Sequence, residues 1–344
     1  MGADAAVHPV LAQVVRSGMV ESWHRGSAVV LAADGSTLFA TGSVTTPMFP
    51  RSSNKPMQGT AMLQLGLELD GQLLALACAS HSGENFHVDG AREILRRAGL
   101  TEADLQCPPD LPLDDAARAA FLRSGGEADR IHMNCSGKHS AMLSTCVVNG
   151  WPTQSYRDPA HPLQEAIKGV IQSLAGETVT TIGVDGCGAP LMALTLTGLA
   201  RAFAAVNTAP AGSAERKVAV AMSTNPTWMS GTTRYEAALM TAVPGMLMKP
   251  GADGVCAFSL ADGRAAAVKI DDGGQRALPP IMAQLLLDLL AGDPGAGADL
   301  AALKEMSSAP VKGGGVPVGE ITPLLPTVPT VLTVPVVPTV PTGG

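Results

Sequence analysis

The chain has 344 residues, of which 46% are hydrophobic and 15% charged. This length is enough to bury a large core in one domain or in two closely packed ones. This composition argues against disorder across the body of the chain. The net charge is −7 with no basic cluster, which argues against nucleic acid or an anionic membrane surface as a partner. A small-molecule substrate is therefore expected.

The sequence predicts a cytoplasmic protein. Its first residues lack the basic stretch and apolar run of a signal peptide. No apolar stretch approaches the roughly 20 residues that a membrane-spanning helix needs. The six cysteines are scattered without a CxxC pair, and in a large cytosolic protein we expect reduced thiols. Small buried hydrophobes are the simplest interpretation of these cysteines.

The hydrophobic pattern predicts strands near both ends of the chain and helices between them. Asp34-Gly35 and Asp262-Gly263 are turn sequences between apolar runs, so each predicts a β-hairpin. Leu73–Ala79 is a short apolar run that we interpret as a strand. The predicted hairpin strands are 28–31 with 37–40 and 255–260 with 265–270, and the predicted helices are 57–69, 89–100, 162–174, 214–222 and 278–290. The order predicts a mixed α/β (α+β) fold whose first and last segments share one sheet.

The C-terminal tail differs from the rest. From Leu324 it repeats Pro, Thr and Val, which blocks a regular helix and removes donors from a central strand. We predict a catalytic unit over 1–323 and an extended or disordered tail over 324–344. The tail has the character of a linker or an altered C-terminus, and we assign it no chemistry.

Ser52 and Lys55 form an SxxK motif. Pro56 fits only the first turn of a helix, so a helix is predicted to begin near Ser52–Asn54 with both side chains on one face. A lysine whose pKa is lowered can take the proton of a serine hydroxyl, and the helix start offers N–H groups to an oxyanion. An N-cap serine with an exposed lysine gives the same pattern. Ser53 has no lysine three residues later, so Ser52 is preferred.

Two further features bear on this chemistry. Ser80 opens a polar cluster, 80–84, directly after a buried run, which is where functional sites gather. A capped helix start explains that cluster equally well. Lys269 lies in a predicted strand on the same face as Ala265 and Ala267, where a lysine is disfavoured unless it is exposed or functional.

Two loops carry thiols beside other ligand types. Cys135 and Lys138 lie in the polar loop 132–139, and Cys187 lies in the glycine loop 184–190. Two thiolates with an amine or imidazole can bind zinc, but the spacing is not that of a standard zinc finger. Gly137 alternatively marks a close backbone approach. Neither a phosphate-binding glycine loop, nor a dinucleotide-binding motif, nor HExxH occurs in the sequence.

Seven ordered blocks together resemble the rhizobial-type (class 3) L-asparaginase II family. They run from about Val20 to Glu320 in the family's order, which makes the set far more specific than any one block. The blocks are 20–26 (VESWHRG), 50–56 (PRSSNKP), 79–84 (ASHSGE), 134–139 (NCSGKH), 185–187 (DGC), 251–255 (GADGV) and 268–273 (VKIDDG). The chain departs from the family pattern at 311–319 and in the tail, which leaves the C-terminal packing open.

The resemblance implies a serine β-lactamase-like fold and the hydrolysis of L-asparagine to L-aspartate and ammonia. It implies two Ser-Lys pairs, carried over as Ser52 with Lys55 and Ser80 with Lys269. It further implies a zinc held by Cys135, Lys138 and Cys187, structural or substrate-orienting, and a homodimer. No organic cofactor is expected.

The resulting hypothesis is acyl transfer. Lys55 takes the Ser52 proton, Ser52 attacks the side-chain amide carbon, and ammonia leaves with a proton relayed through Ser80, which Lys269 keeps polarised. Arg51 and Asp185 are candidates for binding the substrate's charged α-groups. A glutaminase or a penicillin-recognising acylase remains an alternative, since one methylene changes binding by only about 1–3 kcal/mol. A second alternative is not an enzyme: the chain would be a non-catalytic, zinc-binding relative that kept the fold.

Overall fold

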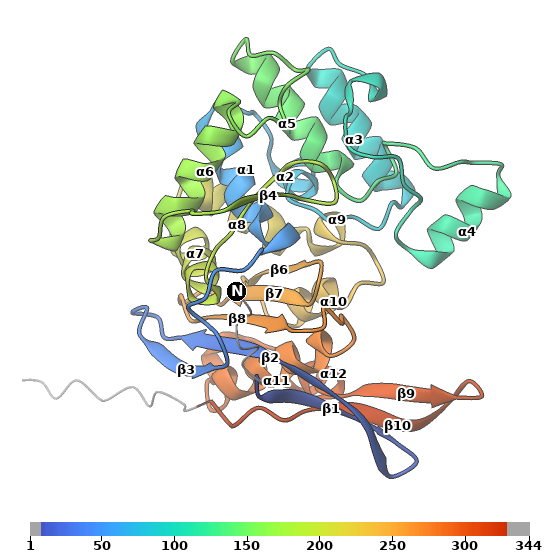
Figure 1. Cartoon of the computed structure of the whole chain (residues 1–344), viewed down its shortest axis with the longest axis vertical. Helices are drawn as coiled ribbons and strands as arrows, with labels where there is room; N and C mark the ends of the chain where they lie inside the picture. The colour runs from blue at the N-terminus through green and yellow to red at the C-terminus, as the bar shows by residue number, and fades with distance from the viewer. Residues whose placement is uncertain (1–7, 329–344) are drawn as a thin grey trace, which may run out of the picture.

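The computed structural model describes residues 8–328 as an antiparallel sheet with helices packed against it (Figure 1). The eight-stranded sheet has the order β6-β7-β8-β2-β1-β10-β9, with β3 paired to β2. A small separate sheet pairs β4 with β5. The strands are β1 Val10–Arg16, β2 Met19–Leu31, β3 Thr37–Thr41, β4 Ile182–Val184, β5 Pro190–Met192, β6 Leu247–Gly251, β7 Val255–Ser259, β8 Ala265–Ile270, β9 Ala309–Gly313 and β10 Val316–Pro323.

The long strand β2 joins the two halves of the sheet. Its first part pairs with β1, and its second part, from Gly26 to Leu31, pairs with β8. A Cβ on Gly26 would lie 2.0 Å from the Lys269 carbonyl oxygen, so only glycine allows the strands to meet there. Both predicted hairpins are confirmed, as is the prediction that the two ends of the chain share one sheet, because β1 pairs with β10.

Helices occupy the middle of the chain. They are α1 Lys55–Gln64, α2 Gly71–Ala77, α3 Asn85–Arg97, α4 Asp115–Arg123, α5 Ser136–Val148, α6 Pro162–Ala175, α7 Leu196–Thr208, α8 Ala214–Thr224, α9 Pro226–Met229, α10 Tyr235–Ala242, α11 Leu278–Leu290 and α12 Leu300–Met306. The five predicted helices are confirmed as α1, α3, α6, α8 and α11. Local signals explain two boundaries of α6, since Pro162 occupies its first turn and Gly176 ends it with a left-handed φ of 66°.

The prediction of a strand at Leu73–Ala79 is wrong. These residues lie in α2 and in the turn after it. Leu and Ala are strong helix formers, and a buried helix surrounded by apolar neighbours shows the same unbroken apolar run as a buried strand. The consequence is that Ser80 follows a helix, and the turn after α2 leaves it partly buried.

The helices form two groups around the sheet (Figure 1). Helix α7 packs on β2, β7 and β8, and it also contacts α1, α6 and α8 of the larger helical group. Helix α11 packs against β8 and β10 and contacts α12. The predicted mixed α/β class is therefore confirmed. Between residues 8 and 328, no helix is both long and apolar enough to cross a membrane. Most of the tail that we predicted to be extended or disordered, 324–344, lies outside the described residues, which end at 328.

Candidate active site

A short helical turn places Ser52 at the start of α1. Residues Arg51–Asn54 form a 3-10 turn (η1), and α1 begins at Lys55 with Pro56 in its first turn. The main-chain N–H of Lys55 donates to the Ser52 carbonyl. Strand β6 crosses this turn closely, because a Cβ on Gly251 would lie 2.5 Å from the Pro50 carbonyl oxygen and 3.2 Å from the Ser52 nitrogen. The turn and the end of β6 therefore hold each other in place.

Ser80 lies between two buried lysine amines. The Nζ atoms of Lys55 and Lys249 each lie 3.0 Å from the Ser80 Oγ atom. Lys55 also donates to the Ala79 carbonyl oxygen and to Cys135 Sγ, which is 3.0 Å away. Lys249 donates to the Pro250 carbonyl oxygen at 2.9 Å. The structure thus brings Lys55 and Ser80 together, and none of these three hydrogen bonds joins the Lys55 amine to Ser52.

Burial, together with the positive charge of Lys55, lowers the pKa of Lys249 to about 7. A buried amine whose pKa lies near neutrality is a free base for much of the time at physiological pH. Two lysines on one serine hydroxyl are therefore a proton-transfer system.

Lys249 was missed in the sequence, and Lys269 was assigned in its place. The Lys269 amine donates to the carbonyl oxygens of Asp253 and Ile270, at 2.6 and 2.5 Å, and its hydrogen bonds do not reach Ser80. In the structure, Ser80 is therefore hydrogen-bonded to Lys249 and not to Lys269. A signal was present, since Lys249 interrupts the apolar run 246–250, but a strand lysine can also be exposed.

The predicted thiol and amine ligands also meet in the interior. Lys138 Nζ lies 3.0 Å from Cys187 Sγ, and Cys135 lies on the other side against Lys55. A hydrogen bond from Cys135, together with the Lys138 charge, holds the pKa of Cys187 far below its ordinary value. Burial disfavours the charged Lys138 amine, yet the nearby negative charge, above all that of the Cys187 thiolate, outweighs it and raises the pKa of Lys138. The cluster is thus a buried ion pair of thiolate and ammonium.

The donor set of this cluster fits a soft cation. Cys135, Lys138 and Cys187 are all buried, and the buried Nε2 atom of the neighbouring His139 makes no hydrogen bond among the described residues. Two thiolates and an amine suit zinc once the amine is deprotonated. Among residues 8–328, however, no group of three or more His, Cys, Asp and Glu side chains forms a metal site.

A small cavity of about 340 Å³ lies beside η1. It is lined by the side chains of Phe49, Arg51, Val184, Leu191, Asp253 and Lys269, together with Gly183. Arg51 Nε donates to Asp185 Oδ1 at 2.8 Å, and Arg51 Nη1 contacts Asp253 Oδ2. The structure thus brings Arg51 and Asp185 together as a salt bridge beside Ser52.

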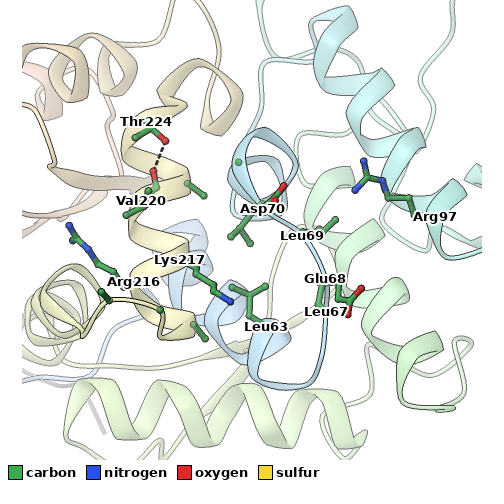
Figure 2. Close-up of a pocket in the computed structure, with 16 residues that line it drawn as sticks. Leu63, Leu67, Glu68, Leu69, Asp70, Arg97, Arg216, Lys217, Val220 and Thr224 are labelled. Carbon is green, nitrogen blue, oxygen red and sulfur yellow. Dashed lines mark hydrogen bonds between the residues drawn. The ribbon is translucent and has the colours of Figure 1, made fainter.

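A larger cavity of about 880 Å³ lies in the helical group (Figure 2). It is bordered by α1, α2 and α8, with leucines on its walls and Lys217 and Asp70 among its charged residues. None of the seven residues predicted for catalysis or metal binding lines it. The smaller cavity, which Arg51 and Lys269 line, is therefore the candidate active site together with the serine–lysine centre.

A partly buried serine hydroxyl held between two buried lysine amines is typical of hydrolases with an activated serine. The family model of L-asparaginase II matches residues 12–323. The chain belongs to the L-asparaginase II family, and it is a hydrolase of that family. No curated protein sequence matches it.

Several solved structures are similar in fold. A beta-lactamase from Mycobacterium bovis shares 14% identity at a TM-score of 0.39, over 72% of this chain and 88% of that one. A putative beta-lactamase from Bacteroides dorei shares 14% identity at a TM-score of 0.40, over 82% of this chain and 92% of that one. The structure of Mglu shares 14% identity at a TM-score of 0.31. The match covers 82% of this chain and 65% of the Mglu chain. At these TM-scores the similarities establish no functional relation.

Proposed function

We propose that this protein hydrolyses L-asparagine to L-aspartate and ammonia through an acyl-enzyme. The observation that carries the proposal is the Ser80 hydroxyl, held 3.0 Å from both the Lys55 and the Lys249 amines. Lys55 itself follows Ser52 by three residues in the block 50–56. Membership of the L-asparaginase II family supports asparagine as the substrate.

In the proposed reaction, the Ser52 oxygen attacks the side-chain amide carbon while Lys55 takes the Ser52 proton. Lys55 is kept free to do so because a proton passes from it through the Ser80 hydroxyl to neutral Lys249. Backbone N–H groups at the start of α1 hold the oxyanion. The C–N bond then breaks, ammonia leaves with a proton returned along the same path, and water hydrolyses the aspartyl ester on Ser52.

Ammonia release from L-asparagine and L-glutamine tests this function. We expect release from asparagine in the wild type and a loss of about 10⁴-fold or more in Ser52→Ala, as for removal of a nucleophile. Ser53→Ala is the matched control, because the Ser53 hydroxyl donates to the Pro50 carbonyl and serves only the turn. Faster release from glutamine would make the protein a glutaminase. Acylation trapped on Ser80, detected by mass spectrometry, would contradict Ser52 as nucleophile.

The proposed relay also predicts the pH dependence. Since Lys249 must be neutral to accept a proton and burial lowers its pKa to about 7, kcat/KM should fall about tenfold per pH unit below that value. Above it, the rate should level off. A pH–rate profile between 5 and 9, with folding checked at each pH, measures this. A profile that is flat across this range rules out Lys249 as the proton acceptor.

We propose that Cys135, Lys138 and Cys187 hold a zinc ion. When bound, the ion would neutralise the buried thiolates and orient substrate or structure. We expect about one zinc per chain by elemental mass spectrometry, and its loss in Cys187→Ser. Cys146→Ser is the control, because Cys146 is a buried free thiol on α5 that lies outside the cluster. Equal metal content in both variants would exclude this site.

We further propose a cytoplasmic homodimer. All six cysteines are free and buried, as expected of a reducing compartment. The hairpins β1–β2 and β9–β10 project from the body (Figure 1). They expose the hydrophobic side chains of Met19, Trp23 and Val316, which suits an interface between two copies. Light scattering of the purified protein measures the oligomeric state.

A further inference from the structure

We propose that Asp253 binds the α-ammonium of the amino-acid substrate while Arg51 binds its α-carboxylate. This inference rests on the hydrolase function proposed above and adds to it a specificity-determining residue. Asp253 lies in the turn between β6 and β7, four residues after Lys249.

Arg51 contacts two carboxylates that differ in their freedom to move. The Asp185 side chain is 11% exposed and binds Arg51 Nε at 2.8 Å, whereas the Asp253 side chain is 64% exposed and contacts Arg51 Nη1. A solvent-exposed ion pair contributes little to stability. The inner pair with Asp185 therefore fixes the guanidinium, and the outer pair with Asp253 can open.

The backbone holds the outer pair at the cavity in an uncommon conformation. Arg51 and Asp253 have φ angles of 52° and 55°, in the left-handed region that costs free energy for residues other than glycine. The Lys269 amine anchors the Asp253 carbonyl oxygen at 2.6 Å, and the close approach of Gly251 to Pro50 fixes η1. These contacts retain a geometry in which the two charged groups face one another.

A zwitterion matches this pair. The cavity of about 340 Å³ is of the size that holds a small ligand, with apolar walls from Phe49, Val184 and Leu191. When an amino acid inserts between the Arg51 guanidinium and the Asp253 carboxylate, two ion pairs replace one and every charge keeps a partner. A ligand that lacks the ammonium would leave Asp253 unpaired.

The cavity also lies where the reacting group is needed. Arg51 directly precedes Ser52, and Gly251, two residues before Asp253, contacts the Ser52 backbone. An amino acid held by its α-groups at Arg51 and Asp253 therefore has its side-chain amide directed to the start of α1. Lys269 thereby acquires a role as a positioning residue for the Asp253 turn.

Binding of three small acids tests the proposal without relying on turnover. L-aspartate has both α-groups, succinate lacks the ammonium and β-alanine lacks the α-carboxylate. By calorimetry, we expect the wild type to bind L-aspartate most tightly. Asp253→Asn should raise the Kd for L-aspartate about 10- to 100-fold and change that for succinate little. Asparagine tolerates the left-handed φ, so this variant keeps the turn.

The matched control is Asp262→Asn, which removes an exposed turn carboxylate from Arg264 in the β7–β8 hairpin. It should leave all three Kd values unchanged. Tighter L-aspartate binding by Asp253→Asn would show that Asp253 only competes with the ligand for Arg51, and would overturn the proposal. Equal Kd values for aspartate and succinate in the wild type would overturn it as well. If the expected pattern appears but no amide releases ammonia, the catalytic function fails and the subsite stands.

Discussion

Lys249→Met is expected to lower kcat for amide hydrolysis by about 10²- to 10⁴-fold, the usual contribution of a positioned acid–base group. Methionine fills the space of the buried lysine stem but cannot accept the proton that reaches the Ser80 hydroxyl, 3.0 Å from Nζ. Binding of the substrate's α-groups at Arg51 does not involve Lys249, so KM should change little. Steady-state kinetics with L-asparagine measure both constants.

Lys269→Met is the matched control for this variant. It removes a second lysine from the neighbouring sheet region, where the amine binds only the carbonyl oxygens of Asp253 and Ile270. Its effect should fall mainly on KM, through the Asp253 turn. A kcat loss in Lys269→Met that equals or exceeds that of Lys249→Met would restore the pairing of Ser80 with Lys269. Thermal melting of both variants separates lost chemistry from lost folding.

Gly251→Ala is expected to reduce kcat/KM by about 100-fold, because roughly 1 Å of misplacement in an active site has an effect of this size. The added Cβ would lie 2.5 Å from the Pro50 carbonyl oxygen, a contact with backbone that cannot move as a flexible side chain can. The turn carrying Ser52 must shift away from β6. The free energy of unfolding should also fall by about 1–3 kcal/mol, as for other overpacked sites.

Gly169→Ala provides the comparison. Gly169 lies within α6, and a Cβ there would meet no atom within 4 Å. Alanine should stabilise that helix by up to about 1 kcal/mol and leave kcat/KM unchanged. Chemical denaturation and the asparagine assay measure the two quantities. Wild-type kinetics in Gly251→Ala would mean that the close approach of β6 does not position Ser52.

Much of the fold was predictable because it depends on local patterns. The Asp34-Gly35 and Asp262-Gly263 turns mark both hairpins, and α11 has the predicted bounds, Leu278–Leu290. The run at Leu73–Ala79 failed because an element buried on all sides loses the periodicity that separates a helix from a strand. The ordered blocks correctly indicated the L-asparaginase II family.

By itself, the sequence determined the family, the mixed α/β class and the residue types available for catalysis. The tertiary structure decided which residues meet. Lys249 and Lys269 are both lysines in C-terminal strands, and alternation along a strand cannot tell which amine reaches Ser80. That choice depends on long-range packing of β6 against η1, which also brings Asp253 to Arg51 across 202 residues of chain. Such contacts depend on how separate elements pack, and no local pattern along the chain records them.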